Sequence, residues 1–98
     1  MPDKRWKAQE RRIAHLLGLE RVGATGKATP DLVGEHLLVE VKDRAELPIW
    51  LLTALTQISH QVMEGQLGVV VLTCPSSVRD LVLLDLRDFR ELLRKAGM

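Results

Sequence analysis

The hydrophobic positions in the first segment of the chain recur with helical spacing. Trp6, Ile13 and Leu17 fall on one stripe, and Gly18 follows them as a natural stop. This pattern predicts an amphipathic helix over residues 3–17.

Two further helices are expected nearer the end of the sequence. Pro48 suits the first position of a helix, and Gly65 follows the pattern that it opens, so this helix is expected over residues 48–63. A last helix over residues 88–96 is predicted before Gly97.

Strands are expected between these helices. Asp31–Val33 and Leu37–Asp43 flank Gly34-Glu35-His36, which is typical of a hairpin turn. Further strands are predicted at residues 20–22, 67–73 and 81–86, and the continuous apolar run at 67–73 is typical of a buried strand. Residues 23–29 lack apolar periodicity and are expected to form a loop. The order of elements predicts a single α/β domain over residues 1–98 with a mixed sheet.

Charged residues interrupt the returning strand of the hairpin. Side chains alternate along a strand, so Leu38, Glu40 and Lys42 are expected on one face, with Val39 and Val41 on the other. In the first interpretation, Glu40 and Lys42 are the solvated face of an edge strand and form a weak ion pair. In the second, they belong to a catalytic site.

The Pro30–Asp31 pair favours the catalytic interpretation. Pairing across the hairpin can bring the Asp31 carboxylate near Glu40. Oxygen ligands at this position suit Mg²⁺, with Mn²⁺ as a substitute. The Val41 carbonyl and water molecules would complete the ligand set. Lys42 would orient an attacking water and stabilise negative charge on a phosphate. The pattern thus predicts metal-dependent phosphodiester hydrolysis.

Glu10 is a third acid that bears on this site. At 100° per residue it lies on or beside the apolar stripe of the first helix, where an unpaired carboxylate would be costly to bury. It could face the metal as an additional ligand. Alternatively, it flanks the stripe and pairs with Arg11 or another basic residue.

These residues resemble the motifs of the PD-(D/E)xK nuclease superfamily. Pro30 and Asp31 look like its PD, Glu40 to Lys42 look like its ExK, and Glu10 resembles its upstream helical glutamate. The resemblance implies a restriction-endonuclease-like αβββαβ core with a mixed central sheet flanked by helices. It also implies that Gln57, on the helix after ExK, reaches the active site.

Within the superfamily, the chain is most similar to archaeal-type and phage Holliday junction resolvases. The similarity includes the loop Thr25-Gly26-Lys27 before PD. It implies a Mg²⁺-dependent DNA endonuclease, selective for branched or otherwise structured DNA. The chain is shorter and less basic than such resolvases, so a flap, repair or restriction-type nuclease is the first alternative. A non-catalytic DNA-binding module on the same fold is the second.

The net charge of +1 hides a basic first segment. A phosphate-contacting surface is expected along it and beyond, and the alternative is a solvated helix face. The residues expected in that surface are Lys4, Lys7, Arg11, Arg12, Lys27 and Arg44, with Arg5 and Arg21 nearby.

The remaining features set limits on function and location. Gly23 to Lys27 lacks the second half of a phosphate-loop pattern, so no nucleotide cofactor is expected. One cysteine excludes an intrachain disulfide and suits a reducing cytoplasm, or the host cytoplasm if the protein is viral. No secretory leader is visible, and the uncharged stretch 47–63 is too polar for a membrane span.

The apolar run Ile49-Trp50-Leu51-Leu52 exceeds what a small core needs and predicts a homodimer, with core packing of Trp50 as the alternative.

Overall fold

The computed structural model describes residues 4–22 and 29–98 of the chain. It forms two compact units, Met1–Ala45 and Glu46–Met98, and each is described by itself below. The predicted loop at 23–29 lies almost wholly outside the described residues.

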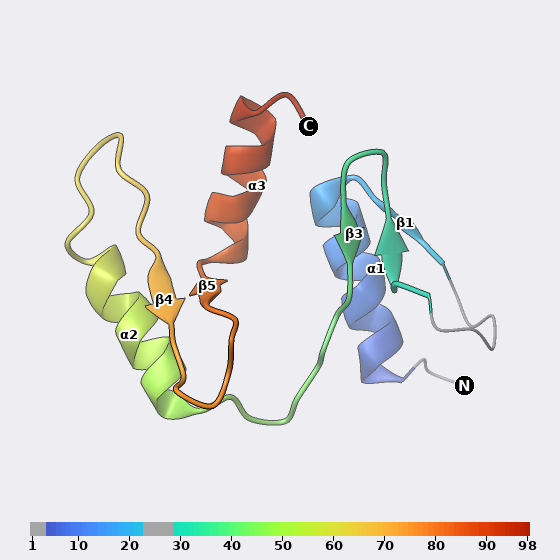
Figure 1. Cartoon of the computed structure of the whole chain (residues 1–98). Helices are drawn as coiled ribbons and strands as arrows, with labels where there is room; N and C mark the ends of the chain where they lie inside the picture. Colours follow the sequence, from blue (N-terminus) through green and yellow to red (C-terminus); the bar gives the residue numbers. More distant parts are fainter. Residues whose placement is uncertain (1–3, 23–28) are drawn as a thin grey trace. The chain divides into compact units, whose positions relative to one another are not determined.

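Within its described residues, 4–22 and 29–45, the N-terminal unit carries one helix and three short strands (Figure 1). They are α1 (Arg5–Leu17), β1 (Glu20–Arg21), β2 (Leu32–Val33) and β3 (Leu38–Val39). The second unit carries α2 (Ile49–Ser59), β4 (Val70–Leu72), β5 (Leu81–Leu83) and α3 (Leu86–Lys95). The protein is therefore a mixed α/β chain, and the predicted order of helices and strands is confirmed.

The strands differ from the prediction in how they pair. In the described part of the chain they form two antiparallel sheets, one in the order β1-β2-β3 and one of β4 and β5. The pairing within each unit is antiparallel, and a single mixed sheet stays a prediction. The sequence indicates strand positions through composition, but pairing direction depends on contacts between distant segments.

Helix α1 covers the first sheet with its apolar face. It ends where Gly18 adopts a left-handed φ of 67°, which turns the chain toward β1. Ile13 and Ala14 of α1 are buried, and Leu32 of β2 is fully buried. Among the described residues, these three form the buried apolar core.

The β2–β3 hairpin is shorter than predicted. Leu32 pairs with Val39 and Val33 with Leu38, so the expected strand over Leu37–Asp43 is wrong beyond Val39. Pro30 has no N–H to donate, and in the same register it would face Val41, so the ladder cannot continue normally there. Glu40 and Lys42 consequently lie just after β3.

The turn of this hairpin depends on a glycine. The Gly34 N–H donates to the Leu37 carbonyl at 2.9 Å, closing the turn. The space that a Cβ of Gly34 would need is filled by the Leu19 side chain. Any larger residue at 34 must therefore displace Leu19.

In the second unit, the helix boundaries follow local capping. Pro48 precedes α2 as its N-cap, and the helix ends at Ser59, four residues before the predicted end. Helix α3 begins two residues earlier than predicted, because the Asp85 side chain accepts the Arg87 N–H at 2.8 Å.

The predicted buried strand at 67–73 is only partly present. Strand β4 covers three residues, and Val71 at its centre is 58% exposed. A continuous apolar run would be buried if both faces of its sheet were covered, but β4 belongs to a two-stranded sheet whose described helix contact is α2. The prediction of full burial was wrong for this reason.

None of the helices in residues 4–22 and 29–98 combines the length and the apolar character needed to cross a lipid bilayer.

Candidate functional site

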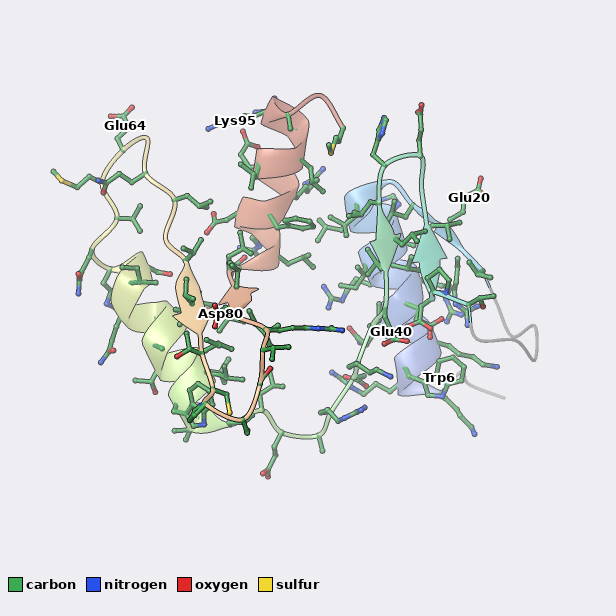
Figure 2. All side chains as sticks on the ribbon, viewed as in Figure 1. Trp6, Glu20, Glu40, Glu64, Asp80 and Lys95 are labelled. Carbon is green, nitrogen blue, oxygen red and sulfur yellow. The ribbon has the colours of Figure 1, made fainter. Side chains whose placement is uncertain are left out.

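The candidate residues of the N-terminal unit flank its hairpin. Asp31 immediately precedes β2, and Glu40, Val41 and Lys42 immediately follow β3. Extending the observed register by one residue places Asp31 opposite Glu40. Figure 2 shows Glu40 on the extended chain after β3.

A hydrogen bond ties Asp31 to the segment after β3. The Val41 N–H donates to a carboxylate oxygen of Asp31 at 2.6 Å. The carbonyl of Asp31 in turn accepts the Val22 N–H at 3.0 Å, so the backbone of Asp31 is fixed by the strand on its other side. These two bonds hold the Asp31 carboxylate beside the backbone between Glu40 and Lys42.

Glu40 and Lys42 project into solvent. Their side chains are 62% and 63% exposed, and Lys42 Nζ lies 3.6 Å from a Glu40 carboxylate oxygen. Val39 and Val41 are half-buried, so the predicted alternation of faces is confirmed. The exposed Glu40–Lys42 pair is what the solvated-edge interpretation predicted, and such a pair contributes little to stability.

Glu10 lies inside the N-terminal unit, as its helical phase predicted. Its relative exposure is 8%, and its carboxylate accepts a hydrogen bond from Arg21 Nε at 2.9 Å. The basic partner that the alternative required is therefore Arg21 of β1. Glu10 is thus buried with a cation that compensates its charge.

Sequence patterns alone did not identify Arg21 as this partner. A signal that Arg21 could reach Glu10 was its position in the two-residue strand β1, which directly follows α1 and contacts it. Arg21 is half-buried whereas Glu20 is exposed, so the two side chains take opposite faces. A buried carboxylate on α1 requires a cation, and the strand packed against α1 is the nearest source.

The residues at the hairpin fit a divalent cation in part. Asp31 and Glu40 supply carboxylate oxygens, and the Val41 carbonyl is a third hard ligand of the kind that Mg²⁺ accepts together with waters. An open hollow beside them is lined by Thr29, Pro30, Leu38, Val39 and Glu40.

Glu10 fits such a cation less well, because its carboxylate already binds Arg21. In residues 4–22 and 29–98, no group of three His, Cys, Asp or Glu side chains is arranged to hold a metal. The acidic side chains of this hairpin that lie next to its strand ends are therefore Asp31 and Glu40.

No family model, curated protein or solved structure matches this chain. The resemblance to PD-(D/E)xK nucleases thus remains a prediction from short motifs and their positions on the hairpin.

The predicted phosphate-contacting residues lie mainly on α1. Lys4, Arg11 and Arg12 are exposed, and Lys7 is half-buried. Arg12 Nε donates to the Gln9 side chain at 2.9 Å. These cations share the N-terminal unit with the hairpin, which agrees with a surface for an anionic partner.

Other predicted residues lie near the end of this unit, in the second unit or outside the described residues. Arg44 is exposed and donates to the Asp43 carbonyl at 3.1 Å, while Arg5 of α1 pairs with the Asp43 carboxylate at 3.0 Å. Lys27 lies outside the described residues. Gln57 is exposed on α2 in the second unit, and its approach to an active site stays a prediction.

Proposed function

We propose that this protein is a Mg²⁺-dependent DNA endonuclease that hydrolyses phosphodiester bonds. The observation that carries the proposal is the 2.6 Å hydrogen bond between the Val41 N–H and the Asp31 carboxylate. It holds an acid beside Glu40 and Lys42, which are the residue types that phosphodiester hydrolysis requires. The αβββαβ order of elements supports a restriction-endonuclease-like core as part of this proposal.

Asp31, Glu40 and the Val41 carbonyl would hold the cation. When bound, the cation would supply Lewis-acid stabilisation of the phosphate and a more acidic water. Both carboxylates lie on the hairpin of the N-terminal unit, where short strands limit how far they can separate.

Lys42 would orient a water and stabilise charge developing on the phosphate oxygens. Its ammonium now contacts Glu40 across 3.6 Å, and both side chains are exposed, so their separation costs little. Glu10 would act as a further acidic contact if Arg21 released it. The exposed cations of α1 would bind the DNA backbone.

Structure-selective cleavage of branched DNA, as in Holliday junction resolvases, is the favoured form of this activity. Phosphate contacts carry no sequence information, so selection by DNA shape is expected. A flap, repair or restriction-type nuclease would use the same residues on another substrate.

Cleavage assays with matched variants test the proposal. The protein is incubated with Mg²⁺ or Mn²⁺ and a four-way junction, a flap, a linear duplex or a single strand. We expect cleavage of at least one substrate, and a loss of about 100-fold or more for Glu40→Gln or Lys42→Ala, the magnitude of removing one transition-state contact. The panel also separates the junction, flap and duplex alternatives.

Glu35→Gln is the matched control, because Glu35 is an exposed acid in the turn of the same hairpin. It should leave cleavage unchanged. Equal cleavage by the Glu40→Gln, Lys42→Ala and wild-type proteins would contradict the proposal.

A non-catalytic DNA-binding module is the second candidate. The ion pairs of two acidic residues favour it, because the carboxylate of Glu40 is paired with Lys42 and that of Glu10 with Arg21. Tight DNA binding without cleavage under any divalent cation would support it over the nuclease.

A further inference from the structure

Trp6 is a large aromatic side chain that the core of the N-terminal unit does not bury. It lies in the first turn of α1 and is 41% exposed, although it falls on the same stripe as the buried Ile13 (Figure 2). Trp6 is also one helical turn before Glu10. An exposed indole therefore lies one helical turn from the buried Glu10.

Two cations surround this ring. Lys7 Nζ is 5.5 Å from the ring centroid, and the Arg21 guanidinium carbon is 6.0 Å from it. Both distances are in the range of cation–π attraction. Arg21 is also fixed by Glu10, so the guanidinium near the indole is held in place by a buried anion.

We propose that Trp6 is a stacking platform for an unpaired base of DNA, with Lys7 and Arg21 contacting the phosphates beside it. The inference rests on the proposed action on DNA and names the feature that makes it structure-selective. Unpaired bases expose their faces at flaps and single strands, whereas in a duplex those faces are covered by neighbouring base pairs.

The chemistry of the cluster fits this partner. Proteins that bind single strands combine a cationic surface that follows the backbone with aromatic rings on which bases stack. Lys4, which is exposed, extends the positive charge at the start of α1, whereas Arg5 is paired with the Asp43 carboxylate. A purely apolar protein partner would leave this concentration of charge without a function.

Fluorescence of Trp6 tests the inference directly. The chain has two tryptophans, so Trp50→Phe leaves Trp6 as the single indole reporter. This variant is titrated in EDTA, which prevents cleavage, with oligothymidylate or with a blunt, fully paired duplex. We expect Trp6 emission to be quenched by oligothymidylate and little changed by the duplex.

Affinity measurements on position 6 provide the second readout. Trp6→Leu should weaken oligothymidylate binding by about 10- to 100-fold, as expected for the loss of one stacked base. Trp6→Phe should retain most of the affinity because it keeps an aromatic face. Val78→Leu, at a fully exposed position outside α1 and α2, is the control and should bind as the wild type does. Circular dichroism of each variant confirms that α1 is retained.

The outcomes separate this inference from the nuclease proposal. Cleavage that depends on Glu40, with no quenching of Trp6 and equal binding by Trp6→Leu, would overturn the inference alone. Quenching by oligothymidylate without cleavage under any metal would support the inference and contradict the nuclease. Equal losses of affinity for duplex and single strand in Trp6→Leu would also overturn it, because they would indicate a general loss of binding.

Discussion

A buried carboxylate needs a compensating cation, and Glu10 obtains one from Arg21. The Glu10 side chain is 10% exposed and that of Arg21 27% exposed, so water screens the pair only partly. Truncating one partner of such a pair leaves the other charge buried without compensation. The resulting loss in the free energy of unfolding is larger than the net contribution of the pair to stability.

Arg21→Gln is therefore expected to destabilise the N-terminal unit by about 2 kcal/mol, the scale of a lost hydrogen bond to a charged group. The Glu10→Gln/Arg21→Gln double variant should recover part of that loss, because no uncompensated charge remains. Urea unfolding followed by Trp6 fluorescence in a Trp50→Phe background measures both.

Arg12→Gln is the control for this experiment, since Arg12 is exposed and its Nε donates to the side-chain oxygen of Gln9. Its stability should match that of the wild type. A double variant that is less stable than Arg21→Gln alone would contradict the expected coupling.

At this scale the sequence predicted single residues better than their partners. Helical phase put Glu10 on or beside the apolar stripe, and strand alternation put Glu40 and Lys42 on one face opposite Val39 and Val41. In the structure Glu10 is buried and the face of Glu40 and Lys42 is exposed. The partners Arg21 and Val41 depend on tertiary contacts across ten or eleven residues, which local periodicity does not contain. For Asp31, Pro30 indicates where the ladder is interrupted, because its missing N–H leaves the opposing carbonyl without a donor. The hydrogen bond from the Val41 N–H to the Asp31 carboxylate has no such local signal.

Among the elements, β2 is the one that anchors the N-terminal unit. Leu32 pairs with residues on both neighbouring strands and is the largest fully buried side chain of the described residues. Since the buried apolar set is so small, removing this side chain takes away a large share of it.

Leu32→Ala is expected to cost about 2–5 kcal/mol, the range for truncating a buried leucine. Leu38→Ala on the adjacent strand is the matched control, because Leu38 is 67% exposed and should lose far less. Both are measured by urea unfolding with Trp6 as the reporter. Similar losses for the two variants would show that Leu32 does not form the core as described.

Elements were predictable where local chemistry defines their ends. Gly18 stops α1 and Pro48 starts α2, and both boundaries are visible in the sequence. Strand lengths were overestimated, because apolar alternation continues past the last paired residue of β3. The ladder ends where a proline offers no donor, and that depends on the register between two strands.

At the scale of the whole molecule, large apolar residues of the second unit are exposed. Helices α2 and α3 contain no buried residue. Ile49 is 80% exposed and Trp50 59% exposed, so Trp50 is not packed in a core in the described structure. Exposed apolar groups of this size commonly mark an interaction surface.

We expect the protein to form a homodimer through the start of α2, which would present two hairpin sites to two DNA strands. Sedimentation equilibrium should then give twice the 11.0 kDa mass of one chain. Trp50→Lys should shift the population to monomer, because a charge at an apolar interface is costly to desolvate. Val78→Lys, at a fully exposed position outside α2, should leave the dimer intact. A wild-type monomer at high micromolar concentration would refute the dimer, and paired cleavage would then require two independent binding events.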